Sequence, residues 1–198
     1  MRFFTRASLI ILSLIIPPIL FAGSPQDQPR TSAPSSASSD SDSINLIIPV
    51  EGVRQDELRD TFNAARSGGR RHHAIDIMAP RGTPALAAAA GEIIRLSYNE
   101  AGGNTIYQMS EDKKLIFYYA HLDSYADDLA PGDYVRQGDV IGYVGDTGNA
   151  GAGNCHLHFS IRAVTDQKKY WQGDNINPYP ILRKADDAIS GEAGNKQK

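Results

Sequence analysis

The sequence predicts a mostly β fold, an antiparallel β-sheet domain with short helices and long loops. The chain of 198 residues has 18 glycines and 11 prolines, a composition that suits one modest domain with many turns. Its apolar segments are short, rich in Ile, Val, Tyr and Phe, and bounded by Gly, Pro, Asn or Asp. Two of them, residues 105–109 and 115–119, flank the polar turn 111–114, which is the pattern of an antiparallel hairpin.

The remaining elements follow from the same signals. Residues 56–65 favour one helix, although their capping signals are weak. Each expected strand is a short apolar run between turn residues. The strands are expected at residues 44–50, 74–78, 91–97, 105–109, 115–121, 140–144 and 156–162.

The N-terminus has the pattern of an export signal. Arg2 and Arg6 precede an apolar run at residues 7–21, which is short for a membrane-spanning helix and contains Pro17 and Pro18. We therefore expect residues 1–24 to be a signal peptide cleaved after Ser24, or an uncleaved N-terminal anchor. Either outcome places the protein in the periplasm or outside the cell, with a membrane tether in the second case.

Composition also divides the rest of the chain. Residues 25–43 are mostly Ser, Pro, Ala, Gln and Asp, too polar to offset their ordering entropy, so we expect a disordered tether. The folded domain is expected at residues 44–183, followed by a flexible tail at 184–198. Cys155 is the only cysteine, so no intramolecular disulfide can form. We expect a monomer.

The charge balance excludes one class of partner. Without residues 1–24 the chain holds 18 basic residues, which is 20 minus 2, against 23 acidic ones, a formal net charge of −5. An acidic domain of this kind does not resemble a nucleic-acid-binding protein, so no nucleic acid is expected as a partner.

All five histidines lie between residues 72 and 158, inside the expected domain. His156 and His158 are two apart in a strand-like run, so both imidazoles leave one face while Leu157 turns to the other. By the same alternation Cys155 points away from the histidines and is expected to be a packing residue. A single histidine is more often structural than a ligand, but the grouping favours a metal or catalytic site.

Two more positions join this group. Asp76 alternates with Ile75 and Ile77, so its carboxylate is either a solvent-facing strand charge or an oxygen ligand, with His72 approaching from the incoming loop. His121 ends an apolar run, where a polar side chain needs a partner. Together with His156 it offers an unligated imidazole that can take a proton, stabilise an oxyanion or protonate a leaving amine. The division of these roles between the two histidines stays open.

Three blocks resemble the lysostaphin-like (LytM-type) zinc metallopeptidases, which cut peptide bonds in bacterial peptidoglycan. The blocks are residues 71–77 with 79–84, residues 119–122, and residues 148–149 leading to 156–159. The resemblance spans roughly residues 44 to 182. It implies the lysostaphin-like peptidase fold, a Zn²⁺ ion held by His72, Asp76 and His158, and a catalytic pair made by His121 and His156.

The resemblance further implies a zinc-dependent metalloendopeptidase that hydrolyses peptide crosslinks or bridges of peptidoglycan, a hydrolase of the cell wall. His73 is expected to be an exposed neighbour of the ligand. Ala74 departs from the family, which commonly has glycine there; if the position needs a positive φ, alanine costs about 1 kcal/mol.

Two other functions compete with this one. The first is a non-catalytic module of the same fold that binds the wall or activates another hydrolase. The second is a lipoyl or biotinyl carrier, because residues 91–145 contain glycine-bounded strands and a turn with Lys113 and Lys114. A carrier needs no clustered histidines, so the peptidase is the preferred hypothesis.

Overall fold

Strand β8 (His156–Ala163) shows how alternating side chains build the sheet. Leu157, Phe159 and Ile161 are fully buried on one face, whereas His156 and His158 line a pocket on the other. This two-residue period puts the apolar side chains into the core and the histidines where they can meet a ligand. The structure, a computed structural model, describes residues 45–166 and 169–184.

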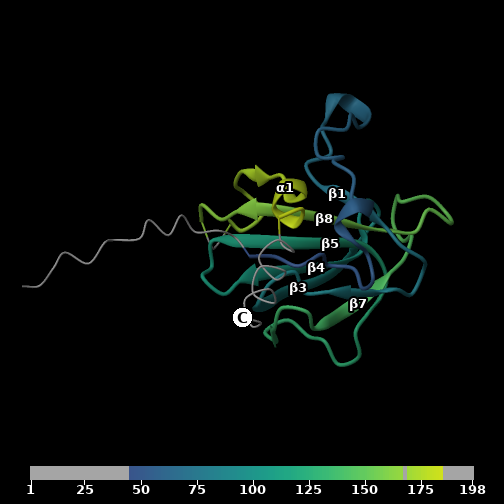
Figure 1. The fold of residues 1–198 in the computed structure, drawn as a ribbon. Helices are drawn as coiled ribbons and strands as arrows, with labels where there is room; N and C mark the ends of the chain where they lie inside the picture. The colour runs from purple at the N-terminus through teal and green to yellow at the C-terminus, as the bar shows by residue number, and fades with distance from the viewer. Residues whose placement is uncertain (1–44, 167–168, 185–198) are drawn as a thin grey trace, which may run out of the picture. The chain divides into compact units, whose positions relative to one another are not determined.

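The described residues form one antiparallel sheet in the order β1-β8-β5-β4-β3-β6 (Figure 1). Strand β2 pairs with β7, which also pairs with β5, and β9 pairs with β8. Strand β1 lies at the edge of the sheet, beside β8. The strands are β1 (Ile75–Met78), β2 (Pro84–Leu86), β3 (Gly91–Asn99), β4 (Gly103–Ser110), β5 (Leu115–Tyr125), β6 (Tyr134–Val135), β7 (Val140–Val144), β8 (His156–Ala163) and β9 (Asn175–Ile176).

The expected antiparallel fold is confirmed. Six of the expected strands are present within a few residues of their predicted ends, as β1, β3, β4, β5, β7 and β8. The predicted hairpin is formed by β4 and β5, in which Ile106 lies opposite Tyr119 and Met109 opposite Ile116. The first strand, expected at residues 44–50, is wrong in its described part, where only Val50 forms an isolated bridge. Pro49 has no N–H to donate to a ladder there.

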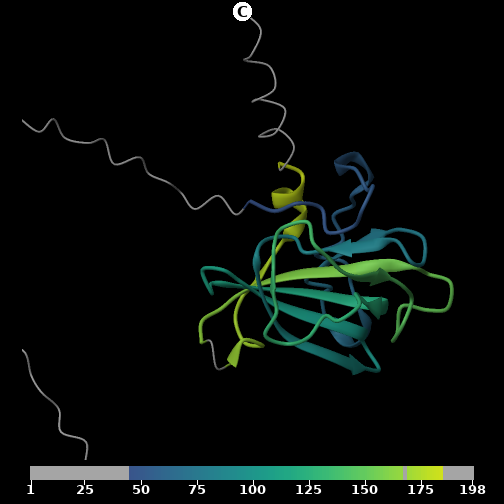
Figure 2. The ribbon, with the colours of Figure 1, turned by 90° about the horizontal axis from the view of Figure 1, so that it is seen from below.

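The helix expected at residues 56–65 is also wrong. Only a single 3₁₀ turn, η1 (Gln55–Glu57), forms at its start. The backbone beyond it bonds across a hairpin instead of along a helix: the His73 amide donates to the Phe62 carbonyl at 2.9 Å. At the tip of this hairpin lies a second 3₁₀ turn, η2 (Ser67–Gly69). Figures 1 and 2 both show the hairpin, in blue, extending from the body of the domain beside β1.

One short helix, α1 (Pro178–Leu182), lies near β8 in the described part of the chain. Asn177 caps its first turn by accepting the Tyr179 amide at 3.0 Å, and Leu182 is fully buried. Across residues 45–166 and 169–184 no helix has the length and apolar character to cross a membrane. The predicted signal or anchor at 1–24, the tether at 25–43 and the tail from 185 onward lie outside the described residues.

Candidate metal centre

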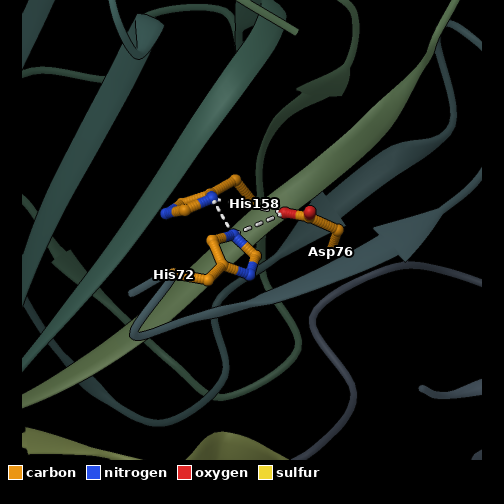
Figure 3. A group of neighbouring side chains, drawn as sticks. All are labelled: His72, Asp76 and His158. Atoms are coloured by element: carbon orange, nitrogen blue, oxygen red, sulfur yellow. Dashed lines mark hydrogen bonds and ion pairs between the residues drawn. The ribbon is translucent and has the colours of Figure 1, made fainter. Parts of the chain in front are cut away.

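His72, Asp76 and His158 converge on one point, as Figure 3 shows. Asp76 on β1 lies directly opposite His158 on β8, so antiparallel pairing brings the two side chains to the same face. His72 comes from the last residues of the hairpin before β1. Its Nε2 atom lies 2.9 Å from His158 Nδ1 and 3.0 Å from Asp76 Oδ1, and the last two atoms are 3.3 Å apart.

Thr61 fixes the orientation of the His72 ring. His72 Nδ1 lies 3.1 Å from the Thr61 carbonyl oxygen, which can only accept, so Nδ1 carries the proton and Nε2 presents a lone pair. The Thr61 hydroxyl also accepts the Asp76 amide at 3.1 Å. Sequence reasoning missed Thr61, because nothing in a lone threonine marks it as the support of two distant side chains.

The donor set of these three residues fits zinc. In the neutral ring His72 Nε2 presents a lone pair to an oxygen of Asp76 at 3.0 Å, so either a proton or a metal cation must lie between the two atoms. Zinc bonds of about 2.0 to 2.2 Å to nitrogen and oxygen imply ligand atoms about 3.3 Å apart in a tetrahedron, close to the three separations seen here. Three ligands leave a fourth position open for water or substrate.

Asp76 stays ionised in this setting. Burial raises the pKa of its carboxyl group, but hydrogen bonds from His158 and His72 outweigh burial and hold that pKa well below its usual range. Its second oxygen, Oδ2, accepts from the Arg66 guanidinium at 2.9 Å. Arg66 therefore orients the carboxylate from the side away from the histidines, while Oδ1 faces the two imidazoles.

His121 and His156 lie beside the three converging residues, with their ring centroids 4.9 Å apart. Each donates its Nδ1 proton to a backbone carbonyl at 2.8 Å, His121 to Thr147 and His156 to Asn154. Both Nε2 atoms are thereby left as bases, and that of His156 lies 3.6 Å from Asp76 Oδ1. Burial lowers the pKa of His121 to about 4, against the opposing hydrogen bond to Thr147, so this imidazole is neutral at pH 7.

The backbone of His121 adopts a left-handed conformation, with φ at 62° in the middle of β5. The sequence predicts a strand end there, but β5 continues to Tyr125 past an irregularity in its pairing with β4. The His121 amide leaves the ladder and donates to the Gly102 carbonyl at 2.7 Å. Such a conformation in a non-glycine residue persists only where its surroundings hold it, as is common at functional sites.

The loop between β7 and β8 supplies that support. The Thr147 hydroxyl donates to the Leu122 carbonyl at 2.7 Å and accepts the Asn104 amide at 3.0 Å. Next to it Gly148, with φ at 71°, packs so closely on Gly103 that a Cβ would lie 2.3 Å from the Gly103 nitrogen. The predicted block at residues 148–149 hints at this loop, but the role of Thr147 is visible only in the structure.

The five histidine and aspartate side chains singled out in the sequence all line one pocket of about 310 Å³. His73 does not line it. His73 is half-buried, with its ring 5.5 Å from that of Phe62 and its Nδ1 accepting from the Asn175 amide group at 2.8 Å, so it is not the exposed residue that the sequence predicts. Positive φ occurs at His73, at 58°, and not at Ala74, so alanine carries no such strain there.

The profile of peptidase family M23 matches residues 70–178, more than half of the chain. The chain belongs to peptidase family M23. Among curated members, lysostaphin of Staphylococcus simulans is 35% identical over 118 residues, covering 59% of this chain and 22% of the relative. The L-Ala–D-Glu endopeptidase of Bacillus subtilis is 32% identical over 139 residues, covering 66% and 41%. The chain thus spans less than half the length of these M23 relatives.

Solved structures of M23 proteins share the fold. The catalytic domain of lysostaphin from Staphylococcus simulans superposes with a TM-score of 0.52 at 26% identity, covering 65% of this chain and 95% of that domain. Members of the family are in general zinc peptidases, and the donor set described above suits that metal.

Proposed function

We propose that this chain is a zinc-dependent metalloendopeptidase that hydrolyses peptide crosslinks or bridges of bacterial peptidoglycan. The observation that carries the proposal is the convergence of His72, Asp76 and His158 at separations near those of a tetrahedral zinc site. Membership of family M23 supports it, and so do the names of the relatives, lysostaphin and an L-Ala–D-Glu endopeptidase.

In this proposal His72 Nε2, His158 Nδ1 and an oxygen of Asp76 hold the metal. Zinc bound there lowers the pKa of a water molecule and polarises the carbonyl group of the scissile peptide. Thr61 and Arg66 act behind the ligands, since each hydrogen bonds a ligand atom or group that faces away from the metal.

His121 and His156 act on protons. Their Nδ1 atoms are occupied by backbone carbonyls, so each presents Nε2. A neutral imidazole at either position can accept the proton that the attacking water loses, and the protonated ring can return it to the leaving amine. The other histidine, when its Nε2 also carries a proton, can donate a hydrogen bond to the oxyanion that develops on the substrate.

We also propose that the protein is exported, with residues 1–24 as signal or anchor, because peptidoglycan lies outside the cytoplasmic membrane. If residues 1–24 remain as an anchor, residues 25–43 tether a monomeric domain, residues 44–183, to the membrane. Immunoblotting of cell fractions, with a version lacking residues 1–24 as the control, tests the export proposal. Exclusive recovery of the full chain from the cytoplasm overturns it.

Digestion of purified peptidoglycan from several wall types tests the function. Protein loaded with one equivalent of zinc is incubated with each wall, and released fragments are identified by mass spectrometry. We expect peptide fragments with new amino termini, none after chelation, and recovery when zinc is returned. A protein that holds zinc stoichiometrically yet releases nothing from any wall is the non-catalytic module instead.

A further inference from the structure

Three arginines line the pocket beside the converging residues: Arg66, Arg70 and Arg71. Asp76 is the only carboxylate among the described residues of the lining. The pocket therefore carries two net positive charges before any metal is bound, if its histidines are neutral. This is the opposite sign to the chain as a whole, whose formal net charge is −3. Positive charge concentrated in one concave place of an acidic protein attracts an anionic ligand to that place.

The projecting hairpin holds these arginines in place. The Arg66 amide donates to the Arg70 carbonyl at 2.9 Å, and Ala65 forms a bridge with Arg71. The turn at the tip runs through two glycines in left-handed conformation, Gly68 and Gly69. Backbone pairing across the hairpin thus fixes the Cα positions from which the three arginine side chains project.

The hydrogen bonds of the three guanidinium groups differ. Arg66 is neutralised by Asp76, as described above. Arg70 donates one bond to the Ser67 carbonyl at 3.3 Å, and Arg71 donates one to the Asn63 carbonyl at 3.0 Å. Within residues 45–166 and 169–184 neither Arg70 nor Arg71 forms an ion pair. Each guanidinium has five N–H donors, so both keep donors and an uncompensated charge at the pocket.

We propose that Arg70 and Arg71 bind a free carboxylate of the wall peptide next to the scissile bond. A guanidinium fork matches the two oxygens of a carboxylate, and charged hydrogen bonds of this kind are about twice as strong as neutral ones. The protein therefore selects acidic wall peptides over neutral oligoglycine bridges or amidated peptides. This inference rests on the proposed peptidase function and specifies its substrate class.

Matched substrates test the inference. The carboxylate can belong to a glutamyl residue within the peptide or to a peptide C-terminus. We would measure kcat and KM of the zinc-loaded full-length protein on two pairs of wall peptides. In one pair the glutamyl carboxylate is free or amidated, in the other the C-terminal carboxylate is free or amidated, and an oligoglycine peptide is added as a neutral reference.

We expect kcat/KM for the free acid to exceed that for its amide by about tenfold or more in at least one pair. The pair that shows the preference identifies the source of the carboxylate. Arg70→Gln and Arg71→Gln should each bring the ratio closer to one, mainly through KM of the acid. Arg70→Lys keeps the charge but loses the forked guanidinium, so its ratio should lie between those of the wild type and Arg70→Gln. Arg136→Gln, an exposed arginine outside the pocket, should keep the wild-type ratio.

A second readout is independent of turnover. Binding of a fluorescent free-acid peptide to zinc-loaded His121→Asn protein should weaken by about tenfold when Arg70→Gln is added. Cleavage of acid and amide at equal rates in both pairs overturns the inference and leaves the peptidase proposal intact. If the protein cleaves no peptide at all, the peptidase proposal fails and this inference fails with it.

Discussion

The Nδ1 atom of His121 lies 2.8 Å from the carbonyl oxygen of Thr147, so the loop between β7 and β8 fixes the tautomer of a histidine on β5. The same imidazole sits on a left-handed backbone whose amide is held by Gly102. The position of this ring is therefore set by two loops as much as by its own strand. A substitution that tests the chemistry of this imidazole must therefore preserve the backbone conformation of residue 121.

His121→Asn removes the imidazole but preserves the backbone conformation, because asparagine tolerates a left-handed backbone better than most residues. We expect the variant to keep one equivalent of zinc, measured by atomic absorption, because His121 is not one of the converging residues. Its kcat on wall peptides should fall by about a hundredfold or more, the typical contribution of a positioned general acid or base.

His73→Asn is the matched control. His73 also has a positive φ, at 58°, but it contacts Phe62 and Asn175 and does not line the pocket. We expect this variant to retain most of the wild-type kcat. Retention of the wild-type kcat by both variants would mean that the His121 imidazole takes no part in the chemistry.

Gly148→Ala should destabilise the protein strongly. A Cβ at this position meets the Gly103 nitrogen at 2.3 Å on a left-handed backbone, so overpacking adds to conformational strain. We expect the free energy of unfolding to fall by about 2 to 4 kcal/mol. In Gly151→Ala, where φ is 91° but no atom lies within 4 Å, the loss should be about 1 kcal/mol. Urea unfolding of both variants checks the difference, and equal losses contradict the close packing of Gly148.

Zinc should stabilise the domain. At a free zinc concentration about a hundredfold above Kd, the gain is about 2.7 kcal/mol, or about 5 to 10 °C in Tm for a domain of this size. His158→Ala should lose this gain when Tm is measured with and without chelator. Cys155→Ser is the control, because the thiol packs against the core and should not bind the metal. Loss of the zinc-dependent rise in Cys155→Ser would instead indicate a thiolate ligand.

The stability of the metal-free protein should depend on pH through His121. Burial lowers its pKa from 6.5 to about 4, so the unfolded chain binds more protons between those values. The free energy of unfolding should therefore fall as pH drops from about 6.5 towards about 4. His158, whose pKa is also lowered by burial, adds to this fall, while the depressed pKa of Asp76 acts only at lower pH.

Urea unfolding in chelator at pH 7 and pH 5 measures this dependence. His121→Asn should show a smaller difference between the two pH values than the wild type, with the remainder due to His158. An identical difference in both proteins would mean that the His121 imidazole is equally easy to protonate in the folded and unfolded chains.

The sequence predicts those parts of the fold that depend on alternation. Ile75 and Ile77 face the core while Asp76 faces the pocket, and Leu157 separates His156 from His158 in the same way. The alternation of side chains between the two faces of a strand follows from neighbouring residues alone, without knowledge of distant contacts. The helix expected at residues 56–65 fails for the opposite reason, because the backbone bonds of this segment are made with residues that follow it in a hairpin.

Supporting residues were beyond sequence reasoning. Thr61 and Thr147 orient His72 and His121 through backbone carbonyls, which every residue has. Their hydroxyl groups bond backbone groups that lie far away in the sequence, so residue type alone does not reveal them. The left-handed backbone of His121 is likewise set by its neighbours. Arg66, Arg70 and Arg71 are visible in the sequence as charges, but their place at the pocket follows from the hairpin.

The pairing of Asp76 with His158 across β1 and β8 makes the centre a check on strand alignment. Strand β1 has four residues and, among the strands of the described residues, pairs with β8 alone, so β8 sets its register. A slip by one residue would turn Asp76 into the core and bring an isoleucine to the histidines. A misaligned molecule would therefore hold no metal and have no activity. Metal binding at this centre would thus report that β1 has paired with β8 in the correct register.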